Sequence, residues 1–306
     1  MNPNASPALF VGGFTIDATT DVPHWPDSNE KLTARKQTLC AGGGATNSAR
    51  CYRQLGPPCE LLVPVPVDGF ADGIVNQLSK AGIHVHRRPV AESFVSFVRP
   101  DGEDRSLIRA PEPEYLMPGT GLDLDSSKFS RLHLDGKEPD AALYYAKEFR
   151  RIGRHVSLDV NPGRENTDEL LGSADIAFAS EKYFKEQGCT EDELFDYFRH
   201  KGCKAGGITY GDKGVVWFAE GFARKETPAF YVPVNEVVDS SGAGDGFQGA
   251  LLASHDLFGL RRTWEQHIRF ACAVAAMMVQ QFGNKNFPTA EEVDAFQQPH
   301  VIATVA

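Results

Sequence analysis

Residues 237–252 read VVDSSGAGDGFQGALL and pass from an extended segment, through small residues, into a helix. The small residues fall at the start of that helix, where the first backbone N–H groups have no helical partner and the dipole favours negative charge. Gly242 and Gly244 let an anion approach the backbone closely. The segment therefore predicts an anion hole that is formed by backbone amides without a lysine.

Asp245 lies in the first turn of the same helix. A carboxylate repels an anion beside it unless a substrate hydroxyl separates the two, and the carboxylate can accept the proton of that hydroxyl. Phosphoryl transfer needs positioning and charge neutralisation, and this arrangement supplies a base for the nucleophile and amides for the transferred group. The alternative is an acidic residue that only stabilises the helix start.

The rest of the chain predicts an α/β fold. Short β-branched runs alternate with helical patterns, which favours a mainly parallel sheet covered by helices on both faces. Strands are expected at residues 8–12, 61–65, 131–134, 155–160, 176–179 and 206–210. Helices are expected at residues 47–55, 70–81, 141–152, 191–201 and 264–282, and Gly283 is a stop signal for the last of them.

Two segments interrupt this alternation. Residues 15–39 are polar and proline-rich, and in residues 93–109 the runs 94–98 and 106–109 flank a Pro100-Asp101-Gly102 turn typical of a β-hairpin. Neither segment has a helix to cover a parallel strand. We therefore expect a small separate sheet, which serves as a lid or a dimer surface. The 306 residues are expected to form a single domain, with a lid formed by approximately residues 13–40 and 90–112.

The composition argues against several classes of partner. The chain has a formal net charge of −10 and no stripe of basic residues, so nucleic acid is expected to be repelled. No apolar run approaches the roughly 20 residues of a membrane helix. The N-terminal residues lack a secretory signal, and the six scattered cysteines suit reduced thiols, so a cytoplasmic protein is expected.

Residues 239–245, DSSGAGD, closely resemble the C-terminal signature of the ribokinase-like, or PfkB, carbohydrate kinases. That signature usually reads Asp-Thr-Thr-Gly-Ala-Gly-Asp, and two serines replace its threonines here. The resemblance implies a ribokinase-like three-layer α/β/α fold with a small β-sheet lid, and Asp245 as the catalytic base. The amides that it implies for the γ-phosphate belong to Gly242, Ala243 and Gly244.

The resemblance also implies cofactors and a nucleotide site. ATP with Mg²⁺ is expected, and Asp239 and Ser241 match positions that help to hold a monovalent cation such as K⁺ in some members. Residues 209–214, TYGDKG, resemble the nucleotide loop Thr-x-Gly-x-x-Gly. Arg105 on the predicted hairpin either reaches the ATP phosphates or is only solvated. The loop residues implied to contact the nucleotide are Thr209, Gly211 and Gly214.

A sugar site is implied near the N-terminus. Residues 42–47, GGGATN, resemble the sugar-binding element of the family, in which glycines let the backbone approach a polyol and an asparagine both donates and accepts. Asp17 matches a carboxylate that grips sugar hydroxyls, unless it is only a turn residue. Residues 132–137, LHLDGK, resemble ketohexokinase-like members, which the chain resembles most. The implied sugar contacts are Asp17, Gly42, Gly43, Asn47 and Asp135.

The sequence departs from the family pattern at three places. Residues 179–183 read ASEKY where an Asn-x-x-Glu element is common, which leaves the Mg²⁺ ligands unassigned and Glu181 as a candidate. Residues 63–68 read VPVPVD in place of a Gly-x-Val-Gly-x-Asp stretch. Gly44 stands where ketohexose kinases have an asparagine, so fructose specificity is not supported.

The sequence thus predicts ATP-dependent phosphorylation of a hydroxymethyl group of a sugar or sugar derivative. A nucleoside kinase, or a catalytically silent sugar or nucleotide sensor with the same fold, stays open as an alternative. The expected partners are a small-molecule sugar and ATP. A homodimer through the lid is also expected, because an exposed small sheet has unpaired edges and an apolar face.

Overall fold

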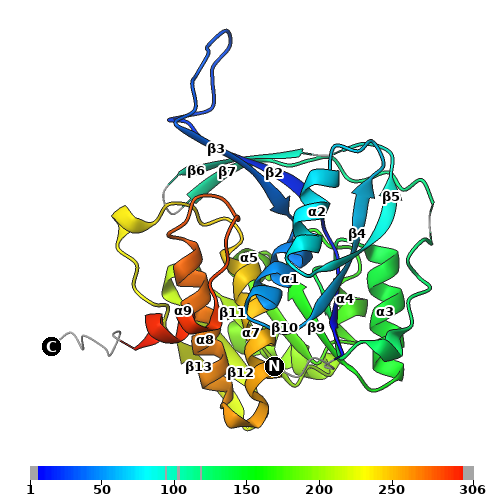
Figure 1. Cartoon of the computed structure of the whole chain (residues 1–306). Helices are drawn as coiled ribbons and strands as arrows, with labels where there is room; N and C mark the ends of the chain where they lie inside the picture. The colour runs from blue at the N-terminus through cyan, green and yellow to red at the C-terminus, as the bar shows by residue number, and fades with distance from the viewer. Residues whose placement is uncertain (1–5, 94, 102–103, 118, 299–306) are drawn as a thin grey trace, which may run out of the picture.

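The computed structural model describes residues 6–93, 95–101, 104–117 and 119–298. A nine-stranded sheet with the order β13-β12-β11-β10-β9-β8-β1-β4-β5 forms its centre (Figure 1). The strands from β11 to β5 along this order are parallel, and β12 and β13 are antiparallel at one edge. The strands are β1 (Ala8–Val11), β4 (Cys59–Pro66), β5 (His84–Val90), β8 (Arg131–Leu134), β9 (His155–Val160), β10 (Ile176–Ser180), β11 (Ala205–Thr209), β12 (Val215–Ala219) and β13 (Phe222–Thr227).

Helices cover both faces of this sheet. On one face lie α1 (Gly44–Gln54), α2 (Asp72–Lys80), α7 (Ala243–Phe258), α8 (Trp264–Met278) and α9 (Ala290–Gln297). On the other face lie α3 (Pro139–Arg151), α4 (Thr167–Leu171), α5 (Glu181–Gln187) and α6 (Glu191–Lys201). Side chains of β1 alternate between the two cores, with Phe10 in one and Leu9 in the other. The predicted three-layer α/β/α fold is therefore confirmed.

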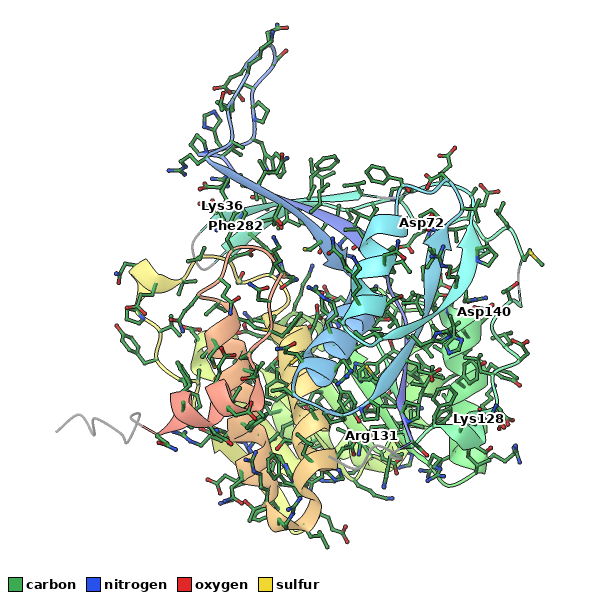
Figure 2. All side chains as sticks on the ribbon, viewed as in Figure 1. Lys36, Asp72, Lys128, Arg131, Asp140 and Phe282 are labelled. Carbon is green, nitrogen blue, oxygen red and sulfur yellow. The ribbon has the colours of Figure 1, made fainter. Side chains whose placement is uncertain are left out.

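A separate four-stranded sheet has the order β3-β2-β6-β7 and lies across one end of the molecule (Figure 1). Its strands are β2 (Thr15–Asp21), β3 (Lys36–Gly42), β6 (Val95–Asp101) and β7 (Asp104–Ile108). The outer pairs are antiparallel, and β2 runs parallel to β6. We call it the small sheet. Figure 2 shows Lys36 of β3 beside Phe282, and its ammonium nitrogen lies 4.7 Å from the ring centroid, which ties the small sheet to the loop after α8.

The predicted hairpin exists, but its turn is placed differently. Pro100 and Asp101 belong to β6, where they pair with Arg105 and Asp104, so they are strand residues rather than turn residues. Gly102 of the predicted turn and Phe94 of the first predicted run lie outside the described residues. The Pro-Asp-Gly composition indicates a reversal of the chain, but its boundaries depend on the pairing with the neighbouring strands.

Several elements differ from the sequence prediction. The last long helix, α8, ends at Met278 rather than at residue 282, although its apolar stripe continues beyond that point. Strands β5, β12 and β13 were not predicted; β5 reads HVHRRPV, so it lacks the apolar run that marks a buried strand. Sheet neighbours, rather than local composition, hold β5 in place, whereas β12 reads VVWFA and has an apolar run of its own. Within the described residues, no helix is long and apolar enough to cross a membrane.

Candidate active site

A cavity of about 860 Å³ lies between the carboxyl ends of the central strands and the small sheet. Residues at or just beyond the ends of β1, β8, β9 and β10 line it: Gly13, Asp135, Asn161 and Ser180. Alternate residues of β6 and β7, among them Ser96, Val98 and Arg105, line it from the small sheet. Parallel sheets commonly bind ligands at this edge, because all their strands end there.

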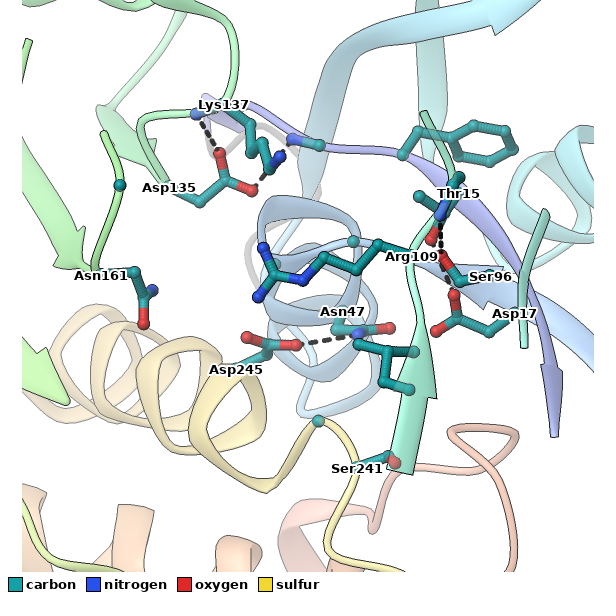
Figure 3. Close-up of a pocket in the computed structure, with 18 of the residues that line it drawn as sticks. Thr15, Asp17, Asn47, Ser96, Arg109, Asp135, Lys137, Asn161, Ser241 and Asp245 are labelled. Atoms are coloured by element: carbon teal, nitrogen blue, oxygen red, sulfur yellow. Dashed lines mark hydrogen bonds between the residues drawn. The ribbon is translucent and has the colours of Figure 1, made fainter. Parts of the chain in front are cut away.

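Two helices begin at this cavity. Gly43 and Gly242 are the residues before the first turns of α1 and α7, and both line the cavity with positive φ angles of 98° and 72°. Asn47 of α1 donates from Nδ2 to Oδ2 of Asp245 in α7, at 2.8 Å (Figure 3). The Oδ1 atom of Asn47 is buried and has no partner among the described residues. Asn47 is therefore placed to accept a hydrogen bond from a ligand while it orients Asp245.

The carboxyl group of Asp245 has a pKa raised to about 6. Burial is the main cause, and the nearby carboxylates of Asp135 and Asp17 add to it, while the Asn47 hydrogen bond and the charge of Arg105 oppose it. A carboxyl with this pKa is ionised at neutral pH and accepts a proton more readily than an ordinary aspartate. Asp245 thus has a raised proton affinity, and its role as the base stays a prediction.

Gly242 and Gly244, which precede Asp245, differ in the space around them. A Cβ atom at Gly242 would lie 2.3 Å from Oδ1 of Asn284, so the loop after α8 excludes any larger residue there. A Cβ atom at Gly244 would meet nothing within 4 Å, and Gly244 is exposed, although it is not among the residues that line the cavity. The amide of Ala243 donates a long hydrogen bond of 3.5 Å to the carbonyl of Ser240, whereas the amide of Gly244 has no partner among the described residues and is open to an anion.

Asp239 joins two loops next to this helix. Its carboxylate accepts from the amide of Ser241 at 2.8 Å and from the amide of Gly283 at 3.0 Å, and its side chain is buried. The hydroxyl of Ser241 is buried without a partner among the described residues. No group of three or more His, Cys, Asp or Glu side chains that could hold a metal was found in the described residues. The monovalent-cation role of Asp239 and Ser241 stays a prediction.

Asp17 lies on the small sheet and faces the cavity. Thr15 donates from Oγ1 to its Oδ1 at 2.7 Å, and burial raises its pKa. A Cβ atom at Gly42 would lie 2.0 Å from Oδ2 of Asp17, so Gly42 makes room for this carboxylate. From the sequence, the glycines of residues 42–44 were expected to let a polyol approach the backbone. In the structure, Gly42 instead makes room for Asp17, the residue that was expected to bind the polyol.

Asp135 lines the cavity, but its carboxylate is already used. Oδ2 accepts from the amides of Gly13 and Ala45 at 2.9 and 2.8 Å, and Oδ1 accepts from the amide of Lys137 at 2.9 Å. These bonds join the end of β1, the first turn of α1 and the end of β8. We therefore interpret Asp135 as a residue that holds the cavity wall, and a direct sugar contact by it stays a prediction.

The nucleotide residues expected from the sequence are only partly brought together. Arg105 lines the cavity and donates to the carbonyl of Ser240 at 3.1 Å, so it reaches the segment that precedes the anion hole. Thr209 pairs in register with Ser180, which lines the cavity. Three of the residues expected there are not among those that line it: Thr209, Gly211 and Gly214. A Cβ atom at Gly214 would lie 2.2 Å from the carbonyl oxygen of Thr227, so this glycine is needed for packing.

The structure adds residues that sequence reasoning missed. Glu181, the Mg²⁺ candidate, pairs with Lys185 at 2.9 Å and is not among the residues that line the cavity, whereas Glu186 of the same helix does line it. Other unpredicted residues of the cavity wall are Arg109, Lys137, Asn161, Arg164, Ser180, Lys182 and Asn284. Several of these residues follow directly after predicted strands. Their position at the carboxyl end of a strand is the sequence signal that could have identified them as residues of the site.

Comparisons with known proteins show the family of this chain. The model of the pfkB family carbohydrate kinases matches residues 8–290. A ribokinase of Arabidopsis thaliana is 26% identical over 304 residues, with 92% of this chain and 78% of the relative covered. The structure of Arabidopsis thaliana ribokinase complexed with ribose and ATP has a TM-score of 0.76 at 24% identity, with 95% of this chain and 98% of that chain covered.

A putative ribokinase II from E. coli, in complex with ATP and Mg²⁺, has a TM-score of 0.81 at 19% identity, with 97% of this chain and 100% of that chain covered. This structure and the Arabidopsis structure share the fold of the chain. The family match spans nearly the whole sequence and includes the segment that carries Asp245. This protein therefore belongs to the pfkB family of carbohydrate kinases, enzymes that phosphorylate sugars.

Proposed function

We propose that this protein transfers the γ-phosphoryl group of ATP to a hydroxymethyl group of a sugar or sugar derivative. The observation that carries the proposal is the Asn47–Asp245 pair at the N-terminus of α7, where a base with a pKa of about 6 adjoins free helix amides. The sugar hydroxyl gives its proton to Asp245, its oxygen forms the new bond to the γ-phosphorus, and ADP leaves. The amides of Gly242, Ala243 and Gly244 stabilise the charge on the transferred group.

The cavity residues at and after the end of β10, together with Arg105, fit ATP and Mg²⁺. Ser180 and Glu186 offer oxygen ligands at the cavity wall, which suit Mg²⁺, and Lys182 and Arg105 offer charge to the phosphates. Mg²⁺ neutralises phosphate charge when it is bound. The loop with Thr209, Gly211 and Gly214 lies beside Ser180 in the sheet, and we propose that the remainder of the nucleotide extends over it.

The sugar is proposed to lie between α1 and the small sheet. Asp17 and the free Oδ1 atom of Asn47 accept from its hydroxyls, and the small sheet acts as the lid that excludes water. K⁺ is proposed to bind near Asp239 and Ser241, where the hydroxyl of Ser241 has no other partner among the described residues.

The Asp245→Asn variant tests the mechanism. It retains the side-chain shape and the amides but removes the base, so turnover is expected to fall by about 100-fold or more. Turnover is measured as ADP release with Mg·ATP and a panel of neutral and charged sugars and nucleosides, with and without K⁺. ATP binding, measured by calorimetry, is expected to persist in the variant. Equal turnover by the variant and the wild type would disprove the role of Asp245.

We also propose a homodimer through the outer face of the small sheet. Leu39, Phe97 and Ile108 are exposed there by 50%, 47% and 55%, and strand pairing places them in one row across the sheet with Ala18. Such a row of large exposed apolar side chains is uncommon on a monomer surface. A second copy that presents the same row would cover it.

A further inference from the structure

Two arginines line the cavity outside the motifs that assign the base, the anion hole and the nucleotide loop. Arg109 follows β7 of the small sheet, and Arg164 lies in the loop between β9 and α4. Figure 3 shows the side chain of Arg109 crossing the cavity, with its guanidinium turned toward the wall that carries Asp135 and Asn161. Arg164 belongs to that wall, because it follows Asn161 by three residues and contacts Asp135.

The guanidinium of Arg109 has no ion pair and no hydrogen bond with any other residue in the part of the chain that the structure describes. Most carboxylates of the cavity have other partners, and Glu186, which has none among the described residues, is the one proposed to bind Mg²⁺. Asp245 is bound by Asn47, Asp17 by Thr15, and Asp135 by backbone amides. An unpaired guanidinium is well solvated in an open cavity, but it loses that solvation when a substrate and the small sheet exclude water.

The triphosphate already has an arginine on β7. Arg105 reaches the carbonyl of Ser240 beside the anion hole. Arg109 lies four residues farther along, just beyond the end of β7, and also lines the cavity; four residues of extended chain place the two Cα atoms about 13 Å apart. At that separation we assign the two side chains to different ends of the cavity. Arg105 is assigned to the phosphates of ATP, and Arg109 is assigned to the sugar.

Contacts with the cavity wall hold the side chain of Arg164 in place. Its Nε donates to the carbonyl of Asp135 at 3.2 Å, and its Cγ lies 3.2 Å from the place that a Cβ atom at Gly136 would occupy. These contacts hold the aliphatic part and Nε of the Arg164 side chain in place. The two terminal guanidinium nitrogens have no partner among the described residues. Asp159, in the strand before this loop, does not neutralise Arg164, because burial and the charges of Asp245 and Asp135 raise the pKa of Asp159 to about 8.

The two lysines that line the cavity differ, because Lys182 is proposed to serve the phosphates of ATP and Lys137 is already paired. Lys137 pairs with Glu112 at 2.7 Å. Apart from Arg105, which is proposed to serve the phosphates of ATP, the cavity therefore presents two guanidinium groups that have no anionic partner among the described residues, one from each side, in a protein whose net charge is −10. Guanidinium groups bind carboxylates and phosphates through two parallel hydrogen bonds, so this pattern fits an oxyanion on the substrate.

We infer that the sugar phosphorylated by this protein carries an oxyanion, either a carboxylate or a phosphate ester, which Arg109 and Arg164 bind. The inference rests on the proposed kinase function and narrows its substrate class. A neutral sugar leaves both guanidinium groups without partners in the closed cavity, so it binds more weakly than its anionic counterpart. Because each charged hydrogen bond is worth about 1.5–3 kcal/mol, the preference is expected to be about 10- to 100-fold in kcat/KM.

The test compares matched substrates. ADP release with Mg·ATP is measured for aldonic and ketoaldonic acids, for sugar monophosphates, and for the neutral sugars of the same chain length. The expected result is a higher kcat/KM for one anionic group than for its neutral counterparts. Carboxylates and phosphate esters form separate arms, so the preferred group identifies the oxyanion. A kcat/KM for neutral sugars equal to or above that of every anionic counterpart would overturn the inference.

Two variants then locate the binding site. Arg109→Gln and Arg164→Gln are each expected to raise KM for the anionic sugar about tenfold or more and to reduce the preference over the neutral sugar. KM for ATP is expected to change much less. Arg35→Gln is the matched control, because Arg35 lies beside the small sheet, is not among the cavity residues and is 71% exposed. A rise in KM for ATP alone in Arg109→Gln would instead assign Arg109 to the phosphates and overturn the inference.

Binding without turnover separates this inference from the kinase proposal. Calorimetric titration of the wild type with the same sugars in the presence of ADP and Mg²⁺ reports affinity even where no ADP is released. Tighter binding of anionic sugars, lost in Arg109→Gln, would support the inference although the kinase proposal had failed. Equal or absent binding of anionic sugars, in a protein that phosphorylates neutral sugars, would overturn the inference and leave the kinase proposal standing.

Discussion

At the scale of single residues, Asp245 has the properties that proton transfer needs. Burial and two neighbouring carboxylates raise its pKa, and the hydrogen bond from Asn47 orients it at the start of a helix. The same first turn attracts an anion through its free amides. In the proposed mechanism, a substrate hydroxyl would lie between the carboxylate of Asp245 and the phosphate and would separate their negative charges.

The pKa of Asp245 predicts how activity depends on pH. Only the carboxylate accepts the hydroxyl proton, so kcat/KM should be halved near pH 6 and should fall about tenfold for each further pH unit below that value. The measurement is the rate of ADP release between pH 5 and 8, with circular dichroism as a control for folding. A rate that stays constant down to pH 5 would contradict Asp245 as the base.

Gly244 allows a test that separates folding from ligand approach. A Cβ atom there meets no protein atom within 4 Å, and alanine favours helix formation over glycine by about 0.5–1 kcal/mol. Gly244→Ala is therefore expected to keep or raise the melting temperature while it raises KM for ATP or lowers kcat about tenfold, because the added methyl group would crowd a phosphate bound, as proposed, at this helix start. Unchanged kinetic constants would show that the transferred phosphate does not approach this amide.

At the scale of elements, the base depends on how closely two helices pack. A Cβ atom at Gly249 of α7 would lie 2.3 Å from the carbonyl oxygen of Ser48 in α1. Ser48 also donates from Oγ to the carbonyl of Asp245 at 2.9 Å, one residue along from Asn47. The close approach of α1 and α7 therefore sets the geometry of the Asn47–Asp245 pair.

Gly249→Ala should damage stability and activity together. The added methyl group pushes the two backbones apart, so the free energy of unfolding is expected to fall by about 1–3 kcal/mol. Turnover is expected to fall further than the loss of folded protein alone would explain, because the Asn47–Asp245 pair is displaced. Gly73→Ala in α2 is the matched control, since a Cβ atom there meets nothing within 4 Å. Urea denaturation and ADP release measure the two effects. A Gly249→Ala variant as stable and active as the control would show that the helices can separate without cost.

At the scale of the whole molecule, the small sheet has two faces with different properties. Its inner face lines the cavity with Asp17, Ser96 and Arg105, and its outer face exposes the row of Leu39, Phe97 and Ile108. The proposed dimer would cover the outer row and hold the sheet over the substrate at the same time. Association and catalysis would then depend on the same element.

The dimer proposal predicts a change in mass. Sedimentation at micromolar concentration should give twice the chain mass for the wild type and the monomer mass for Phe97→Glu, because the charge would be buried without a partner. Leu260→Glu is the control, since Leu260 is fully exposed in the turn after α7, away from the small sheet. A monomeric wild type would remove the proposal.

Much of the proposed chemistry could be inferred from the sequence because its residues are local, and the family match supports the reaction class. The anion hole and Asp245 occupy consecutive residues at a helix start, and a helix start has the same free amides in any fold. The alternation of strands and helices also predicted the three-layer architecture, since a parallel sheet has to be covered on both faces. The strands without an apolar run, such as β5, and the end of α8 were not predictable, because tertiary neighbours decide them.

The arrangement of the site was decided by the tertiary structure. Asn47 and Asp245 are 198 residues apart in sequence, and their contact exists only because α1 and α7 begin at the same edge of the sheet. Glu186 rather than Glu181 faces the cavity because of the orientation of α5. Arg109 and Arg164 carried no motif, and only the position of the small sheet over the ends of the strands brings both to one cavity. The sequence determined which reaction the protein can perform, and long-range packing decided which side chains surround the substrate.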